Sequence, residues 1–315
     1  MAIDPAAFEA YRAASSARSS LPRLGLGLAV IGASWMAGTV IVLAAGSFLY
    51  RLDAANAAAQ DFLSAPVGVM SALASFIGIW IGVAVAERFV HREPPSALLG
   101  NGRRISWNGF AKGFAAVAVT SLLSEIALYA LWPGIERGAI SPASWLLFLV
   151  PVVLLAFVQI SAEEILFRAY LPRHLAARFR SPWAWGLPPL ALFTALHWSA
   201  SSSLAINLCI LATIGAFALV LMLTVYATGN LGAAFGAHLG NNLFGFLLIS
   251  HQQSYNAFAL FTARPLEGAG WSGSDVLLLA AIGIVASGMT ALLLLHPRSP
   301  LKIEPDRGKA RDWPG

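Results

Sequence analysis

Long apolar runs, separated by short polar segments, make up most of the chain. We expect about eight of these runs to be membrane-spanning helices, because each is near or above the ~17–20 residues needed to cross a bilayer. The expected spans are 24–50, 66–88, 107–132, 144–171, 188–204, 206–227, 230–250 and 275–296. The boundary between the fifth and the sixth is the weakest, so seven spans is the alternative count. The pattern predicts an all-α fold, a polytopic membrane helix bundle.

Basic residues are unevenly distributed between the polar segments. They gather before the first span, between the second and third, after the fourth and after the last. Cytoplasmic loops of membrane proteins carry such an excess, so we expect both termini in the cytoplasm. The domains expected are a cytoplasmic segment over 1–23, a membrane domain over 24–296 and a loose cytoplasmic tail over 297–315. Within the first, Ala6–Ala14 should form a short surface helix after Asp4-Pro5.

Composition supports a membrane protein and argues against other classes. Of 315 residues, 58% are hydrophobic and 11% are charged, whereas soluble domains have about 25% charged residues. The net charge of +5 comes from basic residues in short loops, so it does not indicate nucleic-acid binding. Cys209 is the single cysteine and lies in an apolar run, which excludes an intrachain disulfide and argues against a cysteine-based metal site.

A few strongly polar residues lie inside the expected spans. They are Glu125, Gln159, Glu163, Glu164, Arg168, His197, Asn207, His238, Asn241 and Asn242. Ionisable side chains in hydrocarbon are costly and are rarely without function. By helix rise, Glu163, His197 and His238 each lie about 12–13 Å inside the cytoplasmic end of their span. Three groups from three spans are thus expected at one depth, in the cytoplasmic half of the membrane.

Helical spacing separates the two adjacent acids. Gln159 and Glu163 are four residues apart and share one face of their helix. Glu164 and Arg168 share a second face, turned by about 100°. We therefore expect Glu164 and Arg168 to form a supporting ion pair, which leaves Glu163 to face the other polar groups.

The seventh span has two distinct faces. His238 and Asn242 share one of them. Gly232, Gly236 and Gly240 form a stripe on roughly the opposite side, which allows close approach of another helix. In the fifth span, Phe193 lies four residues before His197, so its ring should line the site and orient the imidazole.

Glu163, His197 and His238 together are a suitable ligand set for a divalent metal, above all zinc. A catalytic zinc with three protein ligands activates a bound water at neutral pH. Without metal, Glu163 and His197 could act as general bases on a water, and His238 or Asn242 could donate to a developing oxyanion. Both versions predict hydrolysis of an acyl bond, and a peptide bond is the one expected; the sequence leaves both versions open.

Three motifs in order resemble those of the CPBP intramembrane proteases, the CAAX-prenyl-protease and bacteriocin-processing (Abi) family. They are Glu163-Glu164-x-x-x-Arg168, Phe193-x-x-x-His197 and His238-x-x-x-Asn242, within a motif-bearing core over 143–250. The resemblance implies a bundle of about eight helices with a catalytic cavity open to the cytosol. It also implies that Glu163 and His197 activate water, that His238 and Asn242 complete the site, and that Glu164 and Arg168 support it. One departure is Ala169, where many members have glycine.

The function expected is an intramembrane metalloendopeptidase that cleaves a membrane-associated or lipid-modified peptide in the bacterial cytoplasmic membrane. The lipid bilayer and the peptide or protein substrate are the expected partners, with no nucleic acid. The main alternative is an ion- or proton-coupled transporter that uses the same buried acids and histidines. The other alternative is a catalytically idle scaffold of the same family.

Overall fold

The computed structural model describes residues 5–13, 19–53, 59–267 and 270–308 and is mostly helical, with 74% helix. Its α-helices are α1 (Ala6–Ala13), α2 (Leu21–Asp53), α3 (Pro66–Ser75), α4 (Ile77–Val85), α5 (Trp107–Leu131), α6 (Pro142–Glu164), α7 (Leu171–Arg178), α8 (Pro182–Trp185), α9 (Leu187–Ala195), α10 (Leu204–Thr228), α11 (Gly232–Leu243) and α12 (Gly273–Leu295). Three π-helical segments continue α4, α6 and α11: η3 (Ala86–His91), η5 (Ile165–Tyr170) and η6 (Phe244–Leu248). Short 3₁₀ helices, η2 (Ala59–Ser64) and η4 (Pro95–Leu98), lie in connections.

Local signals set the ends of the long helices. The hydroxyls of Ser106, Ser141 and Ser203 accept hydrogen bonds from the first turns of α5, α6 and α10. Ser272 does the same for α12 within a capping box. Gly229 ends α10 with a φ of 62°, a left-handed conformation that glycine adopts without strain.

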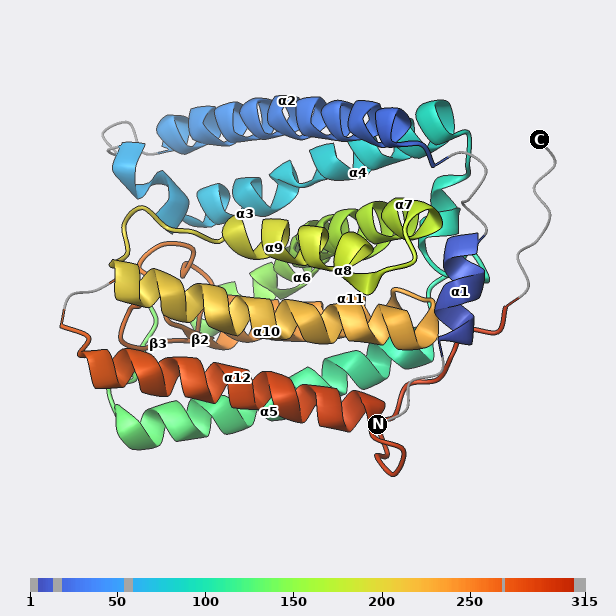
Figure 1. Cartoon of the computed structure of the whole chain (residues 1–315). Coiled ribbons are helices and arrows are strands. Elements are labelled where there is room, and N and C mark those ends of the chain that lie inside the picture. The colour runs from blue at the N-terminus through green and yellow to red at the C-terminus, as the bar shows by residue number, and fades with distance from the viewer. Residues whose placement is uncertain (1–4, 14–18, 54–58, 268–269, 309–315) are drawn as a thin grey trace.

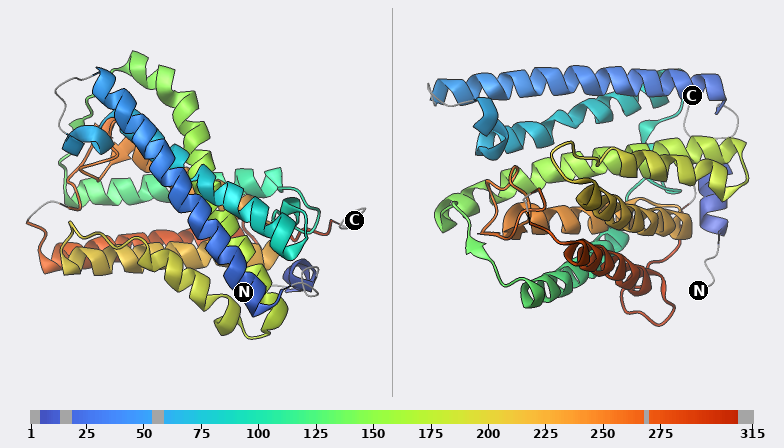
Figure 2. Two further views of the ribbon diagram at one scale, coloured as in Figure 1. Left: turned by 90° about the horizontal axis from the view of Figure 1, so that it is seen from above. Right: turned by 60° about the vertical axis from the view of Figure 1, so that its left-hand side comes forward.

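The helices form layers (Figure 1). Helix α2 lies along one side of the bundle with α3 and α4 beneath it, and it crosses the other helices obliquely (Figure 2). The α6–α7 rod and α9 follow, and α10, α12 and α5 lie on the opposite side. Large apolar side chains on the outer face of α2 are exposed, including Met36 at 67% and Ile41 at 68%. An exposed apolar face of this length fits contact with lipid.

Six helices within the described residues are long and apolar enough to cross a membrane. They are Leu21–Leu52, Pro66–His91, Trp107–Leu131, Pro142–Arg178, Leu204–Thr228 and Gly273–Leu295. The predicted count of eight is therefore not confirmed. The other two predicted spans, 188–204 and 230–250, contain the shorter helix α9 and the α11–η6 pair.

The predicted helix over 188–204 is wrong in its extent, because α9 ends at Ala195. The serine-rich segment that follows is held in a turn by Asn207 of α10. The Asn207 side chain accepts a hydrogen bond from the Ser199 amide (2.9 Å) and donates one to the Ser199 carbonyl (2.8 Å). Side-chain bonds of this kind compete with helical backbone bonds, so the helix does not continue.

The predicted end of the fourth span at Leu171 is also wrong, since α6, η5 and α7 run on to Arg178. The prediction rests on Pro172, because the residue that precedes a proline avoids the α-helical region. In the structure, the preceding turn is π-helical, and the Leu171 amide bonds to the Leu166 carbonyl. Proline then occupies the first turn of α7, where the missing donor is tolerated.

The four basic segments lie together at one end of the bundle, next to α1 (Figure 1). The Arg12 guanidinium donates to the Ala176 carbonyl at 2.7 Å. The Asn101 side chain donates to the carbonyls of Ala7 and Asp306, both at 2.9 Å. This arrangement is the one that the distribution of basic residues requires.

Helix α1 packs into the bundle more closely than the predicted surface helix. Phe8 is 1% exposed and stacks on Trp185, with ring centroids 4.6 Å apart. Tyr11 is 2% exposed and donates to the Leu98 carbonyl at 2.7 Å. Residues 1–4 and 14–18 of the predicted N-terminal segment, Ala14 of the predicted helix among them, lie outside the described residues.

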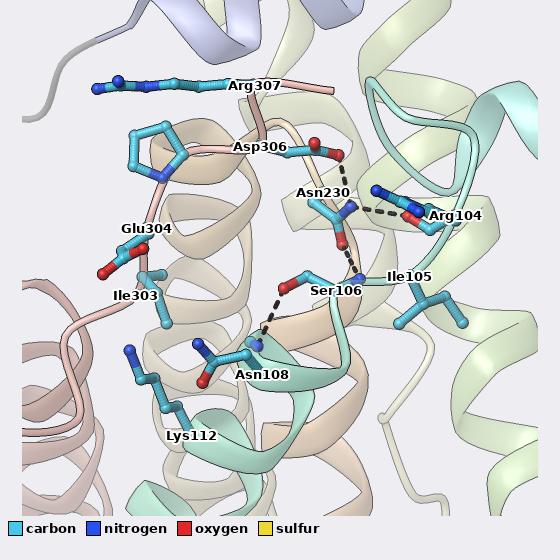
Figure 3. Close-up of a pocket in the computed structure, with 12 residues that line it drawn as sticks. Arg104, Ile105, Ser106, Asn108, Lys112, Asn230, Ile303, Glu304, Asp306 and Arg307 are labelled. Atoms are coloured by element: carbon cyan, nitrogen blue, oxygen red, sulfur yellow. Dashed lines mark hydrogen bonds between the residues drawn. The ribbon is translucent and has the colours of Figure 1, made fainter. Parts of the chain in front are cut away.

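Part of the predicted loose tail is seated on the bundle (Figure 3). Ile303 is 5% exposed and packs against α5 and α12 residues. The Asp306 carboxylate accepts from the Asn230 side chain at 2.8 Å, and the Asp306 amide donates to the Thr228 carbonyl at 2.7 Å. The tail is thus ordered over 297–308, and a hollow of about 230 Å³ lies between it and the start of α5. Residues 309–315 lie outside the described residues.

A small three-stranded sheet lies at the end opposite α1 (Figure 1). Its order is β1 (Glu136–Arg137), β3 (Phe261–Thr262), β2 (Ile249–Ser250). The β1 and β3 strands are antiparallel with Glu136 opposite Thr262, and β2 and β3 are parallel with Ile249 opposite Phe261.

Candidate functional site

A cavity of about 560 Å³ lies among α5, α6, α10, α11 and α12. Its wall includes one or more residues from each of the three motifs, and Gln159 as well. The motif residues on the wall are Glu163, Phe193, His197, His238 and Asn242. The other two motif residues, Glu164 and Arg168, lie behind this wall and are 0% and 1% exposed. The three motifs, far apart in sequence, thus meet around one cavity.

Glu164 connects two of the motifs. Its Oε1 lies 3.2 Å from Nη1 of Arg168, one helical turn along the same rod. The same oxygen accepts a 2.8 Å hydrogen bond from Nδ1 of His238 on α11. The expected Glu164–Arg168 pair is therefore present, but Glu164 also holds the imidazole of the third motif. Because Nδ1 donates to this carboxylate, the other ring nitrogen of His238, Nε2, points away from Glu164.

That second nitrogen faces Glu163. The distance from Nε2 of His238 to Oε2 of Glu163 is 3.6 Å, too long for a direct hydrogen bond. Oε2 of Glu163 is buried and has no hydrogen-bond partner. A buried carboxylate oxygen without a partner is costly, and a gap of this length between polar atoms suits a bridging water.

Two amides fix the other oxygen of Glu163. Gln159 donates to Oε1 of Glu163 at 2.9 Å, and Asn242 donates to the Gln159 carbonyl oxygen at 2.9 Å. Asn242 is therefore linked to Glu163 through Gln159 rather than directly. The shared face of Gln159 and Glu163 was expected from their spacing, whereas the link to α11 was not.

His197 lies in the turn that follows α9. Its backbone amide donates to the Thr194 carbonyl at 3.1 Å. In a continued α-helix this amide would bond to the Phe193 carbonyl instead, four residues earlier. The Phe193 carbonyl instead lies 2.9 Å from Nδ1 of His197. A carbonyl oxygen can only accept, so Nδ1 carries the proton and Nε2 of the neutral ring is a base. The early end of α9 thus sets the tautomer of this histidine.

The Phe193 ring packs against groups from all three motifs. Its centroid lies 4.7 Å from that of His197 and 6.2 Å from that of His238. The guanidinium carbon of Arg168 lies 3.9 Å from the same centroid, which is a cation–π contact. The ring therefore separates the buried cation from the cavity and limits where both imidazoles can turn.

Close packing of α11 on α5 places His238. A Cβ added at Gly236 would collide with the Phe110 carbonyl, and one at Gly232 with the Ser106 carbonyl. At Gly240 the same atom would lie 3.2 Å from the Phe114 carbonyl. The glycine stripe predicted from the sequence is confirmed as a contact surface, and its partner is α5. This contact turns the opposite face, with His238, toward α6.

The predicted zinc ligands fit only in part. Two ligands of a tetrahedral zinc lie about 3.4 Å apart, close to the 3.6 Å between Glu163 and His238. His197 does not complete the set, because the ligand atoms of the three are not all within 4.8 Å of one another. Among the described residues, the group that meets this distance is Glu87, His91 and His174. All three are buried, at 0%, 0% and 1% exposure.

Sequence reasoning missed that second group. Glu87 lies just inside the predicted end of the second span, and His91 and His174 lie outside the predicted spans. The signal was the four-residue spacing of Glu87 and His91, which puts them on one helical face. His174 could not be added from sequence, because α7 was not expected to continue past Pro172.

Another polar contact lies on the wall of the 560 Å³ cavity, near the β-sheet. Nε2 of His251 lies 3.1 Å from Oε2 of Glu125, the acid of α5 to which no role was given. His251 lies outside the candidate spans. Burial disfavours its charged form, but the hydrogen bond and negative charge of Glu125 outweigh burial and raise the pKa of His251.

Comparison with known proteins agrees with the motifs. Residues 141–244 match the family model described as type II CAAX prenyl endopeptidase Rce1-like. The uncharacterized protein YyaK of Bacillus subtilis (strain 168) is 23% identical over 235 residues, covering 71% of this chain and 73% of that protein. No solved structure matches the chain.

The matched segment contains all three motifs, which lie on α6 and η5, on α9 and the turn after it, and on α11. Six apolar helices and a match to an intramembrane enzyme family point to an integral membrane protein. The family predicted from the motifs is confirmed over this segment: residues 141–244 match an Rce1-like domain, which supports a CPBP (CAAX protease) family assignment.

Proposed function

We propose that this protein is an intramembrane endopeptidase that hydrolyses a peptide bond of a membrane-associated or lipid-modified substrate. The observation that carries the proposal is the pair Glu163 and His238. A buried carboxylate oxygen without a partner lies 3.6 Å from an imidazole nitrogen, on the wall of a cavity. This gap is the proposed position of the attacking water.

In the proposed reaction, Glu163 accepts a proton from the water, with Nε2 of His197 as the second base. The resulting hydroxide adds to the carbonyl carbon of the substrate. His238 and Asn242 donate to the oxyanion that forms. The C–N bond then breaks as the amine nitrogen takes the proton, which leaves one carboxylate and one amine for each water consumed.

The position of His238 supports its role as a donor. Glu164 holds its Nδ1, and its Nε2 points toward Glu163 on the cavity wall. In the proposed reaction Nε2 carries the proton that is donated to the oxyanion.

A zinc-bound water is the other form of this chemistry. Glu163 and His238 are spaced as two of its ligands, and such an ion would lower the pKa of its water. The third proposed ligand, His197, does not form with these two a group whose ligand atoms all lie within 4.8 Å of one another. The route through the carboxylate and the imidazoles is therefore the one that we propose.

We place the site in the cytoplasmic half of a bacterial inner membrane, with both termini cytoplasmic. His238 is six residues from the first residue of α11, or about 9 Å along the helix, counted from the end that gathers the basic segments. Residues 143–250 are the proposed catalytic core. The long helices outside this core enclose the cavity and face lipid.

The test is peptide cleavage by the purified protein in lipid nanodiscs, with a farnesylated CAAX peptide and a matched non-prenylated peptide as probes. Glu163→Gln should lose cleavage by at least about 10²-fold, the contribution of a general base. Glu125→Gln, which changes another acid of the same cavity, should keep most of the activity. Full cleavage by Glu163→Gln would exclude the proposal, and a proton flux lost in the same variant would favour a transporter.

A further inference from the structure

A second cluster of metal-binding side chains lies outside the cavity. Glu87 and His91 come from η3, and His174 comes from α7. One ligand atom from each lies within 4.8 Å of the others, and all three side chains are buried. We propose that Glu87, His91 and His174 bind a divalent cation, with zinc as the best fit, and that this ion joins the ends of two helical rods.

The first argument is an unsatisfied acid. Oε1 of Glu87 accepts a 2.7 Å hydrogen bond from Nε2 of His174. Oε2 of Glu87 is buried, has no hydrogen-bond partner, and belongs to a residue that is 0% exposed. A buried carboxylate needs a partner for both oxygens, and a cation supplies one.

The second argument is how the two imidazoles are supported. The Ser19 hydroxyl lies 2.7 Å from Nδ1 of His174, and the Tyr170 hydroxyl lies 2.9 Å from Nε2 of His91. Metal-bound histidines usually have one nitrogen on the ion and the other on a hydrogen-bond partner that fixes the ring. Here a hydroxyl group contacts one nitrogen of each ring, as such a partner would. In the proposed site, Nε2 of His174 would give up its proton and exchange its hydrogen bond to Glu87 for the ion, next to a ligand nitrogen of His91.

The chemistry of the ligand set selects the ion. Two imidazoles and one carboxylate favour zinc and related transition ions over magnesium or calcium, which prefer oxygen ligands. Ligands of a tetrahedral zinc lie about 3.4 Å apart, so binding requires an adjustment of the order of 1 Å. The stacked rings of His91 and His174, with centroids 3.8 Å apart, must turn slightly toward each other.

The proposed ion would act on the fold rather than on the substrate. His174 belongs to the same continuous rod as Arg168, while Glu87 and His91 end the rod that packs under α2 (Figure 1). An ion shared by both would hold the rod of the first motif against the first helices. This proposal is independent of the proposed peptidase reaction, because none of its ligands lines the cavity.

The test is metal analysis of the full chain purified from zinc-supplemented cells, together with its thermal unfolding. The wild type should carry about one zinc per chain, and Glu87→Gln and His174→Gln should lose it. His251→Gln, which removes a histidine of a Glu–His pair elsewhere, should keep it, and so should Glu163→Gln. Zinc that is lost in Glu163→Gln but kept in Glu87→Gln would overturn the proposal.

A second measurement uses wild-type protein only, so it tests the proposal even if the variants fail to fold. Wild-type protein treated with a chelator should unfold several degrees lower, and added zinc chloride should restore its Tm. A chelator-treated wild type whose Tm does not respond to zinc, or a wild type that is purified without metal and takes up none, would also overturn the proposal.

Discussion

Glu164 accepts a 2.8 Å hydrogen bond from Nδ1 of His238, across the contact between α6 and α11. The same oxygen forms the ion pair with Arg168. One buried carboxylate thus neutralises a cation on its own helix and fixes the proton of an imidazole on another. The second acid of the first motif is more than a support for its own helix, since it sets the direction of the third motif.

The first prediction concerns this shared oxygen. Glu164→Gln should reduce cleavage by about 10²- to 10⁴-fold, the range for groups that hold a catalytic histidine in its tautomer. It should also destabilise the protein by about 3–5 kcal/mol, because Arg168 remains charged, buried and unpaired. Cleavage and Tm in nanodiscs are the measurements.

A double variant separates the two effects. Glu164→Gln combined with Arg168→Met removes both charges, so it should recover much of the stability without recovering cleavage. Recovery of cleavage together with stability would show that Glu164 serves only the ion pair.

The second prediction concerns the glycine contact between α5 and α11. Gly236→Ala should destabilise the protein by about 1–3 kcal/mol, because the added methyl group collides with the Phe110 carbonyl. It should also lower cleavage, since His238 lies on the same helix. Gly288→Ala is the matched control, because a Cβ at this exposed position of α12 meets no atom within 4 Å. That control should be neutral or stabilising by about 0.5–1 kcal/mol, and equal Tm changes in the two variants would contradict the role of the contact.

The sequence predicts contacts along one helix better than contacts between helices. Gln159 with Glu163 and Glu164 with Arg168 follow from a four-residue spacing that any α-helix imposes. The bond from His238 to Glu164 depends on how far α11 is rotated about its axis. That rotation is set by the glycine contact with α5, whose partner helix the sequence does not identify.

The ends of the helices also differ in whether local sequence or a distant contact sets them. Apolar runs predicted α5, α10 and α12 within a few residues, because their ends coincide with local caps. The early end of α9 depends on Asn207, a residue of the next helix that bonds to the turn. The continuation past Pro172 depends on a π-helical turn. Neither has a local sequence signal, and both move site residues: the first places His197 and the second places His174.

The third prediction concerns the C-terminal segment. Asp306→Ala should destabilise the protein by about 1–2 kcal/mol, because its carboxylate accepts from Asn230 (2.8 Å) and from the Gly308 amide (2.9 Å). Glu304→Ala is the control, since Glu304 is exposed in the same segment. Limited proteolysis should cut the first variant within 297–308 sooner than the control or the wild type. Equal cleavage rates in all three would mean that the seated tail is not held by Asp306.

The fourth prediction concerns pH and the pair of His251 and Glu125. Because the pKa of His251 is raised in the folded protein, the folded state binds the proton more tightly than the unfolded chain does. The pair therefore stabilises the fold fully below the ordinary histidine pKa of about 6.5, and this contribution is lost as the pH rises through the raised value. Since both side chains are partly exposed, at 22% and 16%, the effect should be of the order of 1 kcal/mol.

The measurement is the Tm of wild type and His251→Gln from about pH 5.5 to pH 9. The wild type should be the more stable at the acidic end, and the difference should shrink toward the alkaline end. His296→Gln, an exposed histidine after α12, is the control and should follow the wild type throughout. A difference between wild type and His251→Gln that stays constant with pH would mean that the pair does not take up a proton on folding. A difference that grows with pH would mean that His251 stabilises the fold as a neutral ring, through packing around the cavity rather than through the charge of Glu125.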